Sequence, residues 1–297
     1  MDFDKNADID TSQIDDLRGS GSAGGGGMIP GGGKTIGGGV VGLILFIVLG
    51  LLGVNGNLPG MDSGSGDNTQ LQEKCARTNP DRFREADCRQ ALTFNDLRAY
   101  WKANLFPTLG AQYQEPRFAI FSQVVNTGCG QATSEVGPFY CPSDQRIYID
   151  LTFYNELAGR FGAPGEFAQA YVIAHEFGHH IQTITGTEQQ VRRQQQRDPG
   201  RANRYSIAME LQADCYAGVW TKAASAPGGL VDTVGEPEIK EALQAAAAVG
   251  DDRIQEKAGG QVNPETWTHG SAEQRQQWFF TGYQSGNPKS CNTFSRL

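Results

Sequence analysis

The segment HEFGHH, residues 175–180, places three of the chain's four histidines on about one and a half helical turns. It lies in the stretch GAPGEFAQAYVIAHEFGHHIQTITG, which predicts a helix with Pro164 near its first turn and Gly186 just past its end. Residues four apart share one face of a helix, so His175 and His179 can direct imidazole nitrogens at one point. This spacing predicts two ligands of a metal ion.

Glu176 follows the first of these histidines and lies about 100° further around the predicted helix. It cannot be a third ligand on the same arc, but it can reach a water held by the metal and act there as general base. Zinc suits imidazole and carboxylate ligands in a tetrahedral site with one open position. Catalytic zinc sites normally have three protein ligands, so we expect the third to come from another element.

A second predicted helix, from residue 204, carries MELQAD, in which Glu210 and Asp214 are also four residues apart. One carboxylate can bind zinc while the other accepts the N–H of a ligating histidine and fixes its tautomer. Gln182 and Thr185 stand where the metzincin extension needs glycine and histidine, so the third ligand should be acidic. We predict Glu210 as ligand and Asp214 as its supporting partner, with the reverse assignment left open.

The other two histidines lie outside the predicted pair of ligands. His180 lies too far around the helix from the predicted ligands to join them, and we expect it to pack or hydrogen-bond against a neighbouring element. His269 precedes a predicted helix in which Ser271 and Gln274 have capping-box spacing. It could stabilise the oxyanion of a tetrahedral intermediate or simply end a loop. Gly178 weakens the helix by about 1 kcal/mol relative to alanine, which indicates close packing at the metal.

All six cysteines lie beyond residue 74, and an even number in one part of the chain predicts up to three disulfides in an exported domain. Spacing alone does not fix the pairing, because six cysteines allow many connectivities. We favour the local pairs Cys75–Cys88 and Cys129–Cys141, which would leave Cys215 and Cys291 for each other. A cysteine zinc cluster is disfavoured because no C-x-x-C occurs.

The N-terminal residues are expected to lie outside the core of the folded domain. Residues 1–35 are Gly-rich without apolar periodicity and predict a disordered tail. Residues 36–54, IGGGVVGLILFIVLGLLGV, carry no charge and would span about 28 Å as a helix, which predicts one transmembrane segment. Basic residues precede this span and next occur at Lys74, which predicts a cytoplasmic tail and an exported domain. A flexible linker, 55–74, would join the span to a domain at 75–297.

Within that domain the patterns predict a mixture of helices and strands. Residues 92–114 predict a helix, and the runs Phe118–Val125 and Arg146–Leu151 are rich in β-branched and aromatic residues. We therefore expect an α+β domain, mostly helical with a small mixed sheet, preceded by one transmembrane helix. The formal charge of −8 argues against nucleic acid as a partner.

Several of these segments together resemble the neutral zinc metallopeptidase family of bacteria, namely GPFYCPSDQRIYIDL, HEFGHHIQ, ELQADCYAGVW and HGSAEQR. The likeness extends over nearly the whole chain. More distantly, the chain is similar to gluzincins, in which a downstream Glu-x-x-x-Asp completes the zinc site, here Glu210 and Asp214. The resemblance implies a zincin fold whose edge strand binds peptide as an added strand. We expect RIYIDL, with Tyr148 and Asp150, to be that strand.

The prediction from sequence is a zinc metalloendopeptidase, exported and anchored by a single pass in a bacterial cell membrane, that acts on peptides or proteins. Zn²⁺ would be bound by His175, His179 and Glu210, with Glu176 as general base. Two alternatives stay open. One is a catalytically silent binding module on the zincin scaffold, and the other is an amidase acting on cell-wall peptides.

Overall fold

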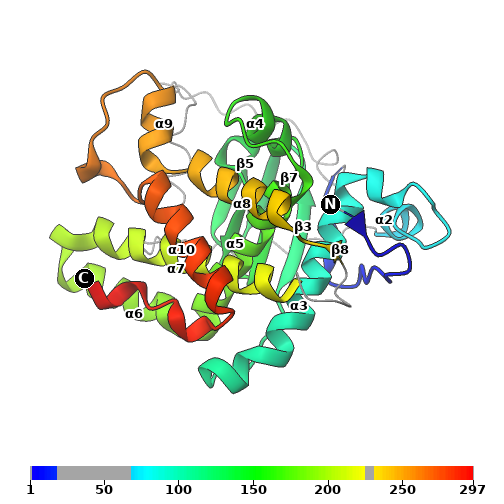
Figure 1. Cartoon of the computed structure of the whole chain (residues 1–297), viewed down its shortest axis with the longest axis horizontal. Helices are drawn as coiled ribbons and strands as arrows, with labels where there is room; N and C mark the ends of the chain where they lie inside the picture. Colours follow the sequence, from blue (N-terminus) through cyan, green and yellow to red (C-terminus); the bar gives the residue numbers. More distant parts are fainter. Residues whose placement is uncertain (1, 19–67, 225–230, 297) are drawn as a thin grey trace, which may run out of the picture.

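The computed structural model describes residues 2–18, 68–224 and 231–296. Its largest sheet has the strand order β2 (Ile14–Asp16), β3 (Arg117–Phe121), β7 (Arg146–Asp150) and β6 (Phe139–Cys141). The first three strands run parallel, and β6 is antiparallel to β7. The sheet lies on one side of helix α5 (Glu166–Ile184), and helices α7 and α10 lie on the other (Figure 1).

Alternation along the strands sorts their side chains onto the two faces of this sheet. In β7, Ile147 and Ile149 face the main core, whereas Tyr148 packs in a smaller cluster on the other face. Both faces are covered, so every residue of β7 is buried. Two smaller sheets complete the strands: a hairpin of β4 (Val124–Thr127) and β5 (Gly130–Thr133), and a pair of β1 (Asp2–Phe3) with β8 (Val231–Thr233).

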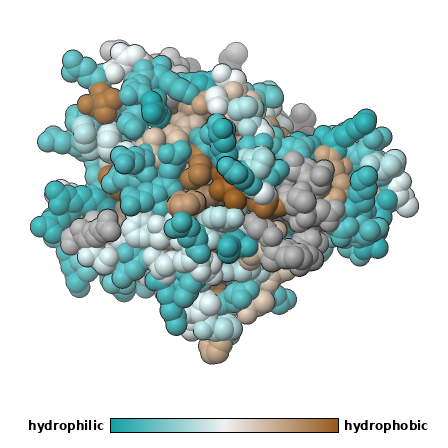
Figure 2. Space-filling model, in the orientation of Figure 1, coloured by the Kyte–Doolittle hydropathy of each residue, from teal (hydrophilic) through white to brown (hydrophobic). Residues whose placement is uncertain are grey.

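The helices form the larger part of the described chain. α3 begins at Ala86, earlier than predicted, and ends at Leu109, and the next residue, Gly110, has the positive φ of 71° that suits a glycine past a helix end. On the face shown in Figure 2 the surface is mostly hydrophilic, and apolar residues gather near its middle. The helix bounds are α2 (Thr69–Lys74), α3 (Ala86–Leu109), α4 (Phe153–Gly159), α5 (Glu166–Ile184), α6 (Thr187–Arg197), α7 (Ala202–Ala224), α8 (Glu236–Ala248), α9 (Asp251–Lys257) and α10 (Ala272–Ser285).

Glycines let the central helices approach closely. A Cβ on Gly178 of α5 would lie 2.9 Å from the Cα of Ala213 on α7, closer than real contacts allow. A Cβ on Gly218 of α7 would lie 1.9 Å from the Phe279 carbonyl oxygen on α10. The expectation that Gly178 serves close packing is therefore confirmed, and the glycine sets how near α5 lies to α7.

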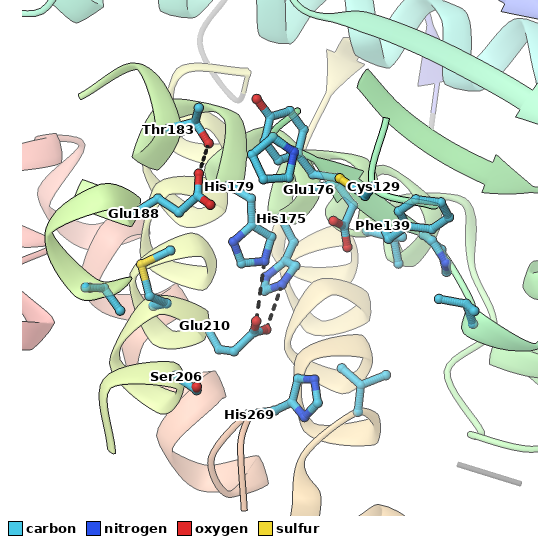
Figure 3. Close-up of a pocket in the computed structure, with 18 of the residues that line it drawn as sticks. Cys129, Phe139, His175, Glu176, His179, Thr183, Glu188, Ser206, Glu210 and His269 are labelled. Carbon is cyan, nitrogen blue, oxygen red and sulfur yellow. Dashed lines mark hydrogen bonds and ion pairs between the residues drawn. The ribbon is translucent and has the colours of Figure 1, made fainter. Parts of the chain in front are cut away.

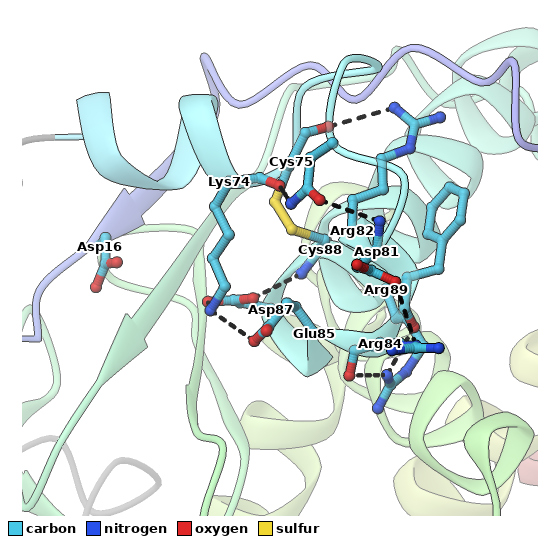
Figure 4. Close-up of a disulfide and its surroundings, with 12 residues drawn as sticks. Asp16, Lys74, Cys75, Asp81, Arg82, Arg84, Glu85, Asp87, Cys88 and Arg89 are labelled. Carbon is cyan, nitrogen blue, oxygen red and sulfur yellow. Dashed lines mark hydrogen bonds and ion pairs between the residues drawn. A yellow bond between two sulfur atoms is a disulfide. The ribbon is translucent and has the colours of Figure 1, made fainter.

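The prediction of a disordered N-terminal tail is wrong for residues 2–18. Ile14 is fully buried and β2 pairs in register with β3, while the guanidinium of Arg82 donates to the carbonyls of Lys5 and Ala7. Figure 4 shows Arg82 beside the Cys75–Cys88 disulfide that fixes this region. Isolated apolar residues in a polar stretch form no periodic pattern, so the sequence does not indicate that they contact the domain.

The pairing of β2 with β3 also bears on topology. Hydrogen-bonded strands lie side by side, so residues 14–16 belong to the folded domain and not to a separate tail. The predicted linker is corrected too, since its last residues form α2. There Lys74 pairs with the buried Asp87 at 3.0 Å.

The predicted transmembrane helix, residues 36–54, lies outside the described residues. Within the described ranges no helix is long and apolar enough to cross a membrane. The fold class is corrected accordingly: over the described residues the structure is a mostly helical α+β domain with small sheets, and these residues include no helix that could cross a membrane.

All three favoured disulfides are confirmed. Cys75 pairs with Cys88, Cys129 with Cys141, and Cys215 with Cys291. The third bridge ties α7 to a C-terminal segment 76 residues further along the chain. Three disulfides are typical of proteins that fold in an oxidising compartment.

The close approach of α5 and α7 predicts that Gly178→Ala destabilises the fold by about 1–3 kcal/mol, because the added methyl group overpacks the contact with Ala213. Thermal unfolding of the purified protein measures this loss. Gly159→Ala is the matched control, because no atom lies within 4 Å of its added Cβ. Equal melting temperatures for the two variants would contradict the role given to Gly178.

Candidate metal centre

Helices α5 and α7 bring three predicted ligands to one point. The Nε2 atom of His175 lies 3.2 Å from one carboxylate oxygen of Glu210, and the Nε2 atom of His179 lies 3.5 Å from the other. One donor atom from each residue lies within 4.8 Å of the other two. Figure 3 shows both rings turned toward the Glu210 carboxylate.

Asp214, one turn beyond Glu210 on α7, supports the first histidine. Its carboxylate lies 2.9 Å from the Nδ1 atom of His175 and is fully buried. Arg275 of α10 donates to both of its oxygens, at 2.8 and 3.0 Å, and the Tyr171 hydroxyl donates as well. Burial pushes the pKa of Asp214 upward, but the charge of Arg275 and the hydrogen bonds from Arg275 and His175 outweigh it and hold the pKa below its usual range.

The second histidine has a neutral partner. The Nδ1 atom of His179 lies 2.8 Å from the side-chain oxygen of Gln182, one turn further along α5. With Asp214 at His175 and Gln182 at His179, each Nδ1 faces an acceptor and carries the proton. Both Nε2 atoms face the Glu210 carboxylate.

This donor set fits a zinc ion. Two imidazole nitrogens and a carboxylate oxygen lie within 4.8 Å of one another, close enough to bind one cation together. Two imidazoles and one carboxylate form the protein ligand set of many catalytic zinc sites. Asp214 contacts His175 at Nδ1, on the side of the ring away from Glu210, so it supports a ligand and does not lie among the ligands itself.

Glu176 lines the same cavity as the metal-binding side chains and is buried. In Figure 3 its carboxylate lies beside the two histidine rings, on the side toward Phe139. Burial raises the pKa of Glu176 above its usual range, although the neighbouring imidazoles partly offset this effect. A raised pKa brings a carboxylate closer to the range in which it exchanges protons efficiently.

His269 reaches the site from the loop before α10. Asp251 holds that loop, because one of its oxygens accepts from the backbone N–H groups of Thr268, His269 and Gly270. The other oxygen lies 3.1 Å from the Nδ1 atom of His269. The Nε2 atom of His269 is buried without a hydrogen-bond partner and its ring lines the cavity, on the side of Glu210 in Figure 3.

His180 points away from the ligands, as predicted, and links α5 to its neighbours. Its Nε2–H donates to the backbone carbonyl of Gln114 at 2.9 Å, so its Nδ1 accepts from the Tyr140 hydroxyl at 3.1 Å. Burial lowers the pKa of His180 to about 4, which keeps the ring neutral. The ring thereby fixes β6, which carries Tyr140, to the metal-binding helix.

The predicted substrate-binding edge strand is wrong. RIYIDL forms β7, which pairs with β3 on one side and β6 on the other. Tyr148 is fully buried, and Asp150 accepts hydrogen bonds from the backbone of Gln123 and Thr152. β-branched and aromatic composition marks a strand but says nothing about its neighbours. Among the strands that the structure describes, β6 has one partner and forms this edge of the sheet.

A cavity of about 180 Å³ extends along the metal-binding residues beneath β6. Most of the wall is apolar, and the polar residues that line it besides the metal site include Thr183, Glu188, Arg192, Gln195 and Ser206. Its apolar lining comes from the β6 region, α5, α6, α7 and the loop after α8, and includes Val136, Pro138, Phe139, Val172, Val191, Met209 and Val249.

Sequence reasoning missed Arg275, Tyr171 and Gln182. Arg275 lies within HGSAEQR, which had been singled out as a motif, but a lone arginine in a helix gives no sign of the partner it meets in the fold. Gln182 lies one turn after His179, so helical spacing could have indicated it.

The chain belongs to the family described as "Putative neutral zinc metallopeptidase", whose model matches residues 1–294. The family name implies zinc as cofactor and supports a zinc-dependent peptidase.

Among similar proteins, the Escherichia coli (strain K12) protein named "Uncharacterized protein YpfJ" is 40% identical over 289 residues, covering 97% of each chain. The Mycobacterium bovis "Uncharacterized protein Mb2605" and the Mycobacterium tuberculosis (strain H37Rv) "Uncharacterized protein Rv2575" are each 48% identical over 226 residues, covering 74% of each chain. No solved structure matches.

The contacts of Asp214 predict that Asp214→Asn weakens zinc binding by about 10–100-fold, because His175 loses a charged acceptor and Arg275 its counter-ion. Competition with a chromophoric chelator measures the dissociation constant. Asp87→Asn is the control, since Asp87 is an equally buried carboxylate paired with Lys74 far from the site. Matching losses in both variants would show a general effect of buried charge instead.

Proposed function

We propose that this protein is a zinc metalloendopeptidase of an oxidising, exported compartment, with the metal held by His175, His179 and Glu210. The observation that carries the proposal is the convergence of two Nε2 atoms and one carboxylate beside the buried Glu176, in a cavity bordered by an edge strand. The three disulfides support the compartment.

Zinc bound there supplies Lewis acidity, which lowers the pKa of a water and polarises the carbonyl of the peptide bond to be cleaved. Glu176 accepts the proton of the attacking water as its oxygen bonds to the carbonyl carbon. Glu176 then delivers that proton to the leaving nitrogen when the C–N bond breaks. A carboxyl group that gains and loses a proton in each cycle works best with a pKa near the operating pH, and burial shifts the pKa of Glu176 in that direction.

His269 is proposed to stabilise the negative charge that develops on the carbonyl oxygen. When both ring nitrogens carry protons, Nδ1 donates to Asp251 and Nε2 donates to that oxygen. The three backbone bonds to Asp251 hold the loop, so the ring is oriented before substrate arrives.

The substrate is proposed to be an extended peptide that adds to β6 as a further strand and places a large apolar side chain in the cavity. Backbone groups of an edge strand offer hydrogen bonds to any sequence. Selectivity would therefore come from the apolar wall, to which Phe139, Val172 and Met209 contribute.

The mechanism predicts that Glu176→Gln retains zinc but lowers turnover at least 10²-fold, because glutamine cannot accept the proton. The full chain should be used, since β1 and β2 belong to the fold. A zinc-loaded sample of each protein would be incubated with a complex peptide library and the products identified by mass spectrometry. Cuts made by the wild type alone, next to large apolar residues, are the expected result.

Other outcomes of that experiment separate the alternatives. Wild-type cuts without apolar preference would reject the substrate class but keep the peptidase. No cuts in the peptide library by a zinc-loaded wild type would reject the endopeptidase. Cell-wall fragments tested in parallel would then distinguish an amidase from a silent binding module.

The position of His269 predicts that His269→Phe lowers the turnover number by about 10²–10³-fold with little change in KM, since the lost donor acts on the transition state. Steady-state kinetics on a peptide cleaved by the wild type provide the measurement. Zinc content and melting temperature should match those of the wild type. A variant that only raises KM would assign His269 to substrate binding.

A further inference from the structure

The side-chain amide of Gln182 contacts His179 through its oxygen and belongs to a longer chain of hydrogen bonds through its nitrogen. Its nitrogen donates to the backbone carbonyl of Met209 at 2.7 Å and to the side-chain oxygen of Gln212 at 3.1 Å. The nitrogen of Gln212 donates in turn to the backbone carbonyl of Cys291 at 2.9 Å. Gln182 is fully buried and Gln212 nearly so, so water does not compete for these bonds.

Two backbone carbonyls fix the direction of this chain. A carbonyl oxygen can only accept, so the Gln212 nitrogen must face Cys291 and its oxygen must face Gln182. By the same reasoning the Gln182 nitrogen faces Met209, and its oxygen faces His179. An oxygen at that place requires the proton of His179 to be on Nδ1, which leaves the Nε2 lone pair toward Glu210.

The far end of the chain is anchored in the C-terminal segment. Cys291 is joined by its disulfide to Cys215, one turn beyond Gln212 on α7. The Thr293 hydroxyl donates to the Ala208 carbonyl at 2.6 Å, which fastens the same segment to an earlier turn of α7. The acceptor for Gln212 is therefore held on both sides.

We propose that Gln182 and Gln212 are positioning residues that set the tautomer and orientation of His179 from the C-terminal segment. This inference rests on the proposed metal site. It assigns different support to the two histidines: Asp214 with its Arg275 counter-ion serves His175, whereas an uncharged relay serves His179. Amides can orient the second ring without adding a further buried charge that would need a counter-ion.

The first test compares substitutions at position 182. Gln182→Met keeps the length of the side chain but removes the acceptor for His179, and we expect its zinc dissociation constant to rise by about 10–100-fold. Gln182→Glu keeps an oxygen toward His179 and, as a protonated carboxyl group, a donor toward the Met209 carbonyl, so we expect it to bind zinc more tightly than Gln182→Met. Chelator competition measures both. Gln276→Met is the matched control, because Gln276 also donates to a backbone carbonyl, that of Leu243, away from the metal.

The second test asks whether the two amides act as one chain. Gln212→Met should weaken zinc binding by about fivefold, the effect of one hydrogen bond, because Gln182 loses one of its two fixed acceptors. In a protein that already carries Gln182→Met, the same change should add nothing. Fully additive effects would overturn the relay.

Nitrogen NMR of the histidine rings gives a readout that a merely structural role would not move. In the zinc-free wild type His179 should be protonated at Nδ1, and Gln182→Met should lose that preference, whereas the ring signals of His175 should not change. If Gln182→Met does not fold, Gln212→Met and Gln182→Glu still test the proposal by the same measurements.

Zinc affinity and a His179 Nδ1 signal unchanged by every substitution would reject the inference while leaving the metal site intact. A wild type that binds no zinc would instead reject the proposed function.

Discussion

The contact between α5 and α7 is the constraint on which the rest of the structure depends. Each helix alone presents a two-residue pattern, His175 with His179 and Glu210 with Asp214, and neither pattern is a metal site by itself. Gly178 lets the helix axes come close enough that the imidazoles and the carboxylate converge within 4.8 Å. The same closeness leaves Asp214 facing the far nitrogen of His175 at 2.9 Å, where it orients the ring instead of reaching the centre.

The surrounding elements hold this pair of helices from several directions. α10 packs on α7 through Gly218 and supplies Arg275, which keeps the Asp214 carboxylate paired. The sheet is tied to α5 through His180, whose neutral ring joins the helix to β6. An edge strand fixed to the metal-binding helix can place a bound peptide at a constant distance from Glu176, as hydrolysis requires.

Much of the site could be predicted because helical spacing is a local property. Positions four apart face the same way wherever the helix lies, so the ligands, Asp214 and Glu176 follow from two short segments. The two local cysteine pairs could be predicted because their residues are close together in the chain, and the third pair then followed by elimination. The edge strand was misassigned, because β6 spans only Phe139–Cys141 and lacks the longer apolar run that marks β7. Residues 2–18 were misassigned because their partners lie far away in the chain.

The sequence by itself determined the chemistry: which side chains can bind zinc, which can accept a proton, and which faces of two helices carry them. Only the tertiary structure decided which carboxylate reaches the ligand cluster and that Arg275, Tyr171 and Gln182 support it. It also decided that β6 forms the edge and that His269 brings an unpartnered nitrogen to the cavity. The physical reason is that hydrogen bonds and close packing join residues distant along the chain, and one sequence without coordinates contains no record of those distances.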